Sequence, residues 1–266
     1  MSRLFKIYPP YLFALGLFIS VLGITLNERF DLFVYIVGLQ FVFANVVKPI
    51  LTLWYVGAII LFYFIFALLW RAAPKSAAFV PLALFLFLFA FLLNKTTNLL
   101  DVRFFEYYLV FLTGMLLARQ NHPSLLLSSQ WIPAKAALAV FGVWFFSFAV
   151  SESANPISIA FVSAAYIFIV SAALLLFALI SRLRITSLWT WVNHVSYASY
   201  FVYLFHRPFW RLIEGFVPIE NLQNQIFFRL VPASALVVVT CYFLQRFYDS
   251  ALAHLKRQIS RPGLSV

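Results

Sequence analysis

The most prominent feature of the sequence is a series of long apolar segments separated by short polar ones. They cover about residues 10–26, 50–70, 77–93, 104–118, 133–150, 157–181, 189–210 and 226–248. Each is close to the roughly 20 residues that a helix needs to cross a bilayer. None alternates between apolar and polar residues, as the strands of a membrane barrel do. The pattern therefore predicts an all-α protein, a polytopic transmembrane helix bundle with about eight spans.

A further apolar segment, residues 31–47, is slightly short for a span and is interrupted by Gln40 and Asn45. We predict an interfacial or re-entrant helix here rather than a span. With the N-terminus in the cytoplasm, this topology places most basic residues of the loops inside and most acidic residues outside, as the positive-inside rule requires. Both termini are then cytoplasmic. Connections are short and no repeat occurs, so we expect one membrane domain over residues 1–266.

Composition narrows the class of protein further. Hydrophobic residues make up 64% of the chain and the mean hydropathy is +0.97, which indicates an integral membrane protein in contact with the lipid bilayer. The net charge of +11 does not indicate a nucleic-acid partner, because the basic residues are dispersed between apolar segments. Cys241 is the single cysteine, and no Cys/His cluster offers a metal site. We expect no metal and no bound cofactor.

The segment "SYASYFVYLFHRPFW", residues 196–210, carries the most conspicuous polar residues of the chain. His206 and Arg207 are adjacent within an apolar helix, where titratable side chains are costly. Helical spacing places Ser199, Tyr203 and His206 on one stripe and Arg207 on the next. In one interpretation His206 bonds a neighbouring helix and Arg207 reaches the headgroups. In the other, which two adjacent costly residues favour, the stripe faces a functional cavity.

A second pair of charges lies at the start of the segment that follows residue 100. Arg103 and Glu106 are three residues apart. Side chains at this spacing are neighbours on a helix, so we predict an ion pair at the outer helix end, worth a few tenths of a kcal/mol.

Several motifs resemble those of a known family. "VSYASYFVYLFHRPFW" resembles the "iSY..YL.H.P" signature of the membrane-bound acyltransferase 3 family, whose members acylate extracytoplasmic carbohydrates. "RLFKIYPPYL", "TLWYVGAIILFYFIF" and "YYLVFLTGMLLAR" resemble three further segments of that family, in the same order. The resemblance covers nearly the whole chain. It implies a bacterial inner (plasma) membrane protein that transfers an acyl group, acetyl in the simplest case, from acyl-CoA to hydroxyls of a cell-envelope or secreted carbohydrate acceptor.

The resemblance also suggests which residues take part in catalysis and substrate binding. His206 is expected to act as a catalytic base or to orient the acceptor hydroxyl, with Tyr203 and Ser199 beside it. Substrate binding is expected from a guanidinium that meets an anionic substrate or lipid group, from aromatic side chains that line the cavity, and from basic N-terminal residues that attract the phosphates of CoA. The guanidinium is that of Arg207, the aromatic side chains are those of Trp54 and Tyr55, and the basic N-terminal residues are Arg3 and Lys6.

One departure from the family keeps other interpretations open. Family members begin with two further helices, the first of which carries an Arg and, eleven residues later, a His held to be the principal catalytic residue. No Arg of this chain has a His at that offset. We therefore expect the chain to be N-terminally incomplete relative to the family and to need a separate chain that supplies these helices. The alternatives are a non-catalytic or truncated family member and a transporter for a glycan-lipid, in which the polar stripe lines a passage.

Overall fold

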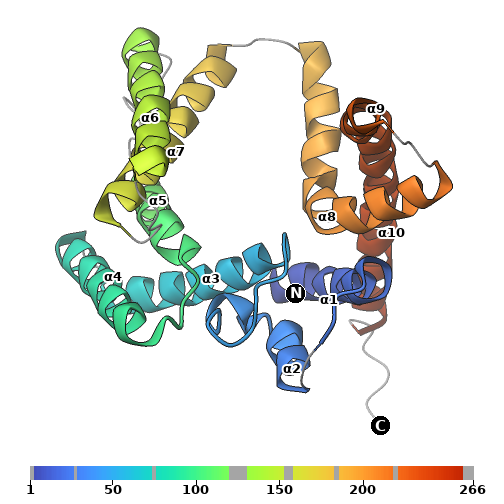
Figure 1. Ribbon diagram of the computed structural model, residues 1–266, viewed down its shortest axis with the longest axis horizontal. Helices are drawn as coiled ribbons and strands as arrows, with labels where there is room; N and C mark the ends of the chain where they lie inside the picture. Colours follow the sequence, from blue (N-terminus) through green and yellow to red (C-terminus); the bar gives the residue numbers. More distant parts are fainter. Residues whose placement is uncertain are drawn as a thin grey trace. The chain divides into compact units, whose positions relative to one another are not determined.

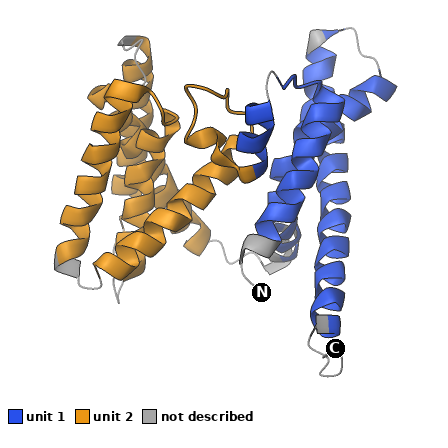
Figure 2. Cartoon of the chain, turned by 90° about the horizontal axis from the view of Figure 1, so that it is seen from below, with its two compact units in different colours: residues 1–36, 185–266 blue, residues 37–184 orange. Residues whose placement is uncertain are grey.

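A computed structural model describes residues 3–26, 29–73, 76–119, 131–152, 158–182, 186–217 and 221–259. Within these ranges the regular elements are helices, and no strand occurs. The chain divides into two compact units, which Figure 2 distinguishes by colour. Unit 1 comprises Met1–Ile36 and Ile185–Val266, and unit 2 comprises Val37–Arg184. Each unit is described by itself.

Unit 1 joins the N-terminal helices to the C-terminal ones (Figure 1). Its elements are α1 (Arg3–Leu22), α2 (Arg29–Val37), α8 (Thr186–Phe216), α9 (Leu222–Phe228), the π-helical turn η2 (Arg229–Ala233) and α10 (Ser234–Ile259). Helix α8 packs along both α10 and α1. Two tyrosine hydroxyls fix α1 in place: Tyr200 of α8 donates to the carbonyl of Ile7 at 2.8 Å, and Tyr8 donates to that of Ile36 at 2.6 Å.

Helix α8 changes direction within its length (Figure 1). Pro208 lies inside the helix. Proline has no backbone N–H, and its ring crowds the carbonyl one turn earlier, so it bends a helix at this point. The polar residues that matter for the site lie on both sides of Pro208, with His206 and Arg207 before it and Arg211 and Glu214 after it.

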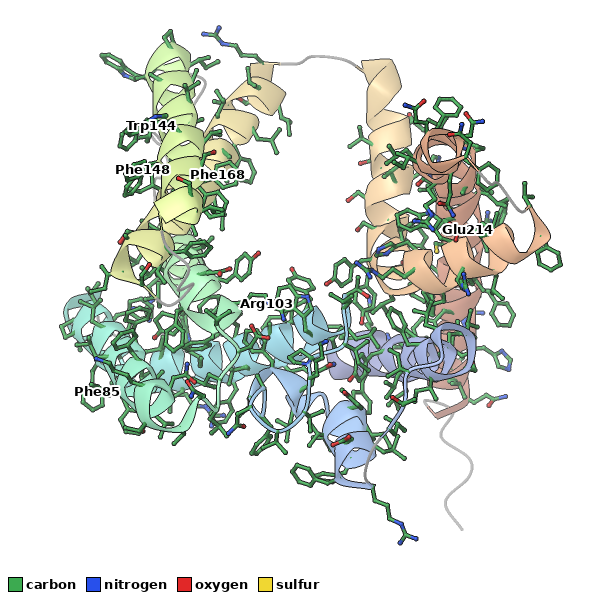
Figure 3. The ribbon with its side chains drawn as sticks, viewed as in Figure 1. Phe85, Arg103, Trp144, Phe148, Phe168 and Glu214 are labelled. Carbon is green, nitrogen blue, oxygen red and sulfur yellow. The ribbon has the colours of Figure 1, made fainter. Side chains whose placement is uncertain are left out.

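Unit 2 holds the most apolar helices. Its elements are the 3₁₀ turn η1 (Leu39–Phe41), α3 (Trp54–Ala72), α4 (Ser76–Thr97), α5 (Arg103–Arg119), α6 (Ile132–Glu152) and α7 (Ile159–Arg182). Aromatic and aliphatic side chains of η1, α3, α4 and α5 form one core, which includes Phe41, Leu69, Phe79 and Phe105. Other large apolar side chains project from the helices, among them Phe85, Trp144 and Phe148 (Figure 3). Such exposed apolar faces are what lipid would cover.

Each of the eight predicted apolar segments overlaps a helix, so the all-α fold class is confirmed for the described residues. Segment 31–47 contains the short α2 and the single turn η1. Within the described ranges, five helical stretches are long and apolar enough to cross a membrane: Trp54–Ala72, Ala78–Thr97, Ile132–Ser151, Ile159–Arg182 and Gln223–Gln258. The count of about eight spans stays a prediction, because α1, α5 and α8 do not meet this standard. The single membrane domain stays a prediction as well.

Candidate functional site

His206 lies in α8 just before Pro208 and is half-buried. Its ring atom Nδ1 is 3.0 Å from the carbonyl oxygens of both Val202 and Tyr203. A carbonyl oxygen can only accept, so Nδ1 carries the hydrogen and donates to both. In the neutral ring, Nε2 then holds the lone pair. Nε2 makes no hydrogen bond with any residue that the structure describes, so it is available as a proton acceptor.

Two aromatic rings contact His206 along its helix face, one before it and one after it in the sequence. The Tyr203 ring centroid is 6.4 Å from the imidazole, and the Trp210 ring meets it edge to face at 4.9 Å. These contacts confirm the helical spacing of Tyr203, His206 and Trp210. The exposed Ser199 instead donates its hydroxyl hydrogen to the carbonyl of Ser196 at 2.7 Å. Ser199 shares the stripe, but its hydrogen bond is made within its own helix.

A cavity of about 310 Å³ lies beside this part of α8. Its lining comes from the end of α1, the last turns of α8 and the start of η2, and consists of Leu22, Arg207, Trp210, Arg211, Glu214 and Arg229. Glu214, labelled in Figure 3, accepts two hydrogen bonds from the Arg229 guanidinium, one of them from Nη2 to Oε2 at 2.9 Å. His206 is not part of the lining. It contacts the cavity wall through Trp210.

Two buried donors on the cavity wall have no acceptor in the described part of the chain. They are Nε of Arg207 and Nε1 of Trp210. A buried N–H without a partner costs about 1–3 kcal/mol, so such groups are rare and often mark a binding site. The sequence predicted Arg207 as a binding residue but missed Arg211 and Glu214. Their spacing of four and seven residues from Arg207, which places them on one helix face, was the signal available. Arg229 is distant in sequence and carried no such signal.

The expected aromatic residues Trp54 and Tyr55 lie in unit 2. Trp54 stacks between Phe41 and Tyr107, with ring centroids 5.9 and 6.0 Å away. The Arg103 guanidinium lies 4.2 Å from its ring centroid. Trp54 is thus embedded in packing contacts, while Tyr55 is exposed. The roles proposed for them in substrate binding stay predictions.

The two basic N-terminal residues belong to α1 of unit 1. Lys6 is exposed, and the side chain of Arg3 lies outside the part that the structure describes. Their expected role with the phosphates of CoA also stays a prediction.

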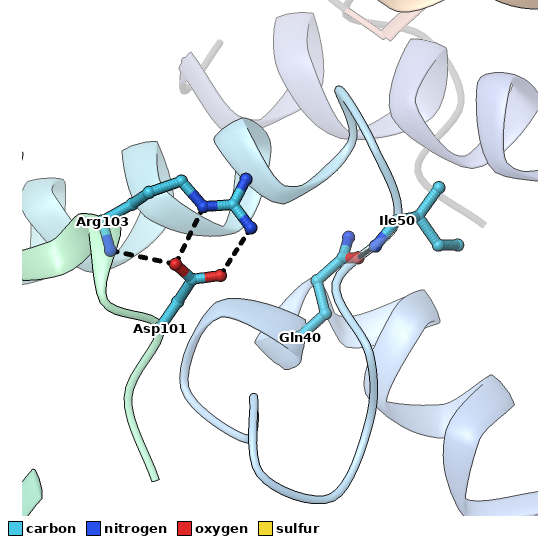
Figure 4. A network of polar contacts seen from close by, with 4 residues as sticks. All are labelled: Gln40, Ile50, Asp101 and Arg103. Atoms are coloured by element: carbon cyan, nitrogen blue, oxygen red, sulfur yellow. Dashed lines mark hydrogen bonds and ion pairs between the residues drawn. The ribbon is translucent and has the colours of Figure 1, made fainter. Parts of the chain in front are cut away.

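The predicted ion pair between Arg103 and Glu106 was wrong. Arg103 pairs instead with the buried Asp101, through Nε to Oδ1 and Nη2 to Oδ2, both at 2.8 Å (Figure 4). Oδ1 also accepts from the backbone N–H of Arg103 at 3.0 Å. Arg103 pairs with Asp101 rather than Glu106 because the Asp101 carboxylate lies just before α5. There it caps the first turn of the helix and also accepts two hydrogen bonds from the guanidinium.

Comparison with protein families identifies the chain. A family model described as an acyltransferase domain, that of the acyltransferase 3 family, matches residues 1–246. The chain belongs to this family. Searches of curated proteins and of solved structures found no match. Membership in the acyltransferase 3 family, together with the apolar helices, makes the chain an integral membrane, acyltransferase-like protein. His206 and the cavity beside it both lie within the matched residues.

Proposed function

We propose that the chain transfers an acyl group, acetyl in the simplest case, from acyl-CoA to a hydroxyl of a cell-envelope or secreted carbohydrate. The observation that carries this proposal is the acyltransferase 3 match, which spans residues 1–246 and therefore includes His206 and the whole of α8. Family membership supplies the reaction class. The donor, the acceptor and the roles of individual residues are part of the proposal.

His206 supports this chemistry through its hydrogen bonds. Its Nδ1–H donates to two carbonyls of the preceding turn, which fixes both the tautomer and the orientation of the ring. In the proposed reaction Nε2 accepts the proton of the acceptor hydroxyl while the oxygen bonds to the thioester carbonyl carbon. The tetrahedral intermediate then expels the thiolate of CoA, which takes up a proton, and the ester remains. A positioned base of this kind contributes about 10²–10⁴-fold to the rate.

The two substrates are proposed to approach from opposite sides of the membrane. Arg3 and Lys6, near the start of α1, attract the phosphates of CoA at the inner face. The acceptor approaches the far end of α8, where the predicted topology places the outer surface. Trp54 and Tyr55 of unit 2 are proposed to contact substrate through their aromatic rings.

The proposal is tested in membranes of the host cell, where any partner chain is present. Labelled acetyl-CoA is added and the label in carbohydrate is counted for the wild type, for His206→Ala and for a matched control, His254→Ala. His254 is an exposed imidazole in α10 that contacts Gln258. We expect transfer to fall about 100-fold or more in His206→Ala and to stay unchanged in His254→Ala.

Equal transfer in all three proteins would contradict the role of His206. Failure of the wild type to acylate any carbohydrate, together with movement of a lipid-linked glycan across the membrane, would replace acyl transfer by transport.

A further inference from the structure

The cavity at the end of α8 contains positive charge that the described residues leave uncompensated. Arg207 and Arg211 make no hydrogen bond or ion pair with any residue that the structure describes. Of the three arginines in the lining, Arg229 alone pairs with an acidic residue in the described part of the chain, Glu214. A guanidinium stays protonated under all physiological conditions. A charged group in a membrane protein normally has a partner or contacts water or a ligand.

The lining also has donors without acceptors. Among the described residues of the lining there are three guanidinium groups and one carboxylate, so these residues carry two positive charges in excess. Both oxygens of that carboxylate already accept from Arg229. Arg207 Nε and Trp210 Nε1 are buried, and neither reaches an acceptor among the described residues. The group that complements this lining is an acceptor with negative charge.

We propose that this cavity is an oxyanion-binding site, which holds a phosphate or carboxylate group. Guanidinium groups bind both through paired N–H donors. A volume of about 310 Å³ lies at the small end of ligand pockets. It suits a phosphate group or a single sugar acid rather than a complete acyl-CoA. The start of the π-helical turn η2 at Arg229 fits this role, because π turns are rare and frequently occur at functional sites.

The position of Trp210 links this site to the reacting end of α8. Its ring lines the cavity and also meets the His206 imidazole at 4.9 Å. An anion held by the arginines would therefore bring the molecule that carries it close to the imidazole. Combined with the proposed function, on which this one step rests, the site makes the acyl acceptor an acidic carbohydrate.

The binding test needs no acyl donor. The full chain in a neutral detergent is titrated with glucuronate and, as the matched uncharged ligand, with glucose, and binding is followed by calorimetry. Glucuronate is expected to bind, with an affinity that falls as salt rises, and glucose is not. Losing a charge-assisted hydrogen-bond pair weakens binding about tenfold or more. We expect that loss for Arg207→Gln, a smaller loss for Arg207→Lys, and none for Arg257→Gln, an exposed arginine of α10.

A second arm identifies the source of the anion. The same titration is repeated in nanodiscs with neutral lipid and with added phosphatidylglycerol. Glucuronate binding that persists in both supports a carbohydrate acid as the ligand. Glucuronate binding to the wild type that phosphatidylglycerol abolishes, but neutral lipid does not, supports a lipid phosphate in the same site. Melting of each variant without ligand verifies that it is folded.

Equal affinity for glucuronate and glucose, or an unchanged affinity in folded Arg207→Gln, would overturn the oxyanion site. This outcome is separate from the fate of the proposed function. Acyl transfer to a neutral carbohydrate without anion binding would remove the site and leave the enzyme. Anion binding without any acyl transfer would support the oxyanion site and contradict the proposed function.

Discussion

Two polar regions of the molecule differ in how completely their hydrogen bonds are made. In unit 2, the loops at residues 38–53 and 98–103 are held by buried polar side chains with partners. Gln40 accepts from the Ile50 N–H at 2.7 Å, and Asp101 binds Arg103 in two places (Figure 4). In unit 1, Arg207 and Trp210 each carry a buried donor without an acceptor among the described residues. Satisfied polar groups stabilise a fold, whereas open ones leave room for a ligand.

The largest predicted effect on stability comes from breaking the satisfied region at Asp101. In Asp101→Ala the Arg103 guanidinium loses its partner and α5 loses the carboxylate that caps its first turn. Removing one member of a largely buried pair costs about 3 kcal/mol. Unfolding in denaturing detergent should show this loss. Arg103→Lys keeps the charge but loses the two-pronged geometry, so its loss should be smaller. A stability of Asp101→Ala equal to the wild type would show that the loops depend on other contacts.

Gln40 tests the same region without a charge. The residue is fully buried, and in Gln40→Ala the N–H of Ile50 loses its acceptor. An unsatisfied buried donor costs about 2 kcal/mol. The matched control is Gln223→Ala, an exposed glutamine of α9, which should change the free energy of unfolding by less than about 0.5 kcal/mol. Equal effects of the two substitutions would contradict the assignment of Gln40 to a stabilising network.

Arg207→Gln should affect ligand binding more than stability, in contrast to Asp101→Ala and Gln40→Ala. Because it forms no pair with any described residue, Arg207→Gln removes an uncompensated charge. The free energy of unfolding should change by no more than about 1 kcal/mol in either direction, while the affinity for glucuronate falls about tenfold or more. The same unfolding measurement applies. A loss as large as that of Asp101→Ala would show that Arg207 is structural and that the two regions do not differ in kind.

The smallest effect is expected at Glu214. Its substitution should strengthen glucuronate binding, whereas Arg207→Gln weakens it. Glu214→Gln removes the one negative charge among the described residues of the lining and frees Arg229 from its ion pair. A unit charge about 4 Å away is worth about 1 kcal/mol in water, so the affinity for glucuronate should rise about fivefold. Calorimetry measures this directly. A fall in affinity would indicate that the Glu214–Arg229 pair positions the site rather than opposing the anion.

The sequence predicts the helices well because hydrophobic periodicity and length are local signals. It also identifies the stripe of Tyr203 and His206 and the neighbouring stripe of Arg207, since helical spacing alone determines both. It does not predict that Asp101 rather than Glu106 pairs with Arg103, because that choice depends on how the chain turns before α5. Nor does it predict Arg229 in the cavity, since the contact to Glu214 depends on the packing of α8 against η2.

The central claim is that His206 acts as a base, and His206→Asn tests it most directly. The amide nitrogen of asparagine can replace Nδ1 as donor to the carbonyls of Val202 and Tyr203, but asparagine has no counterpart of the basic Nε2. Acyl transfer in host membranes and thermal unfolding are measured on the same variant. We predict a stability close to the wild type and a loss of transfer of about 100-fold or more. Retained transfer at unchanged stability would contradict the claim, and so would a transfer that falls only in step with the folded fraction.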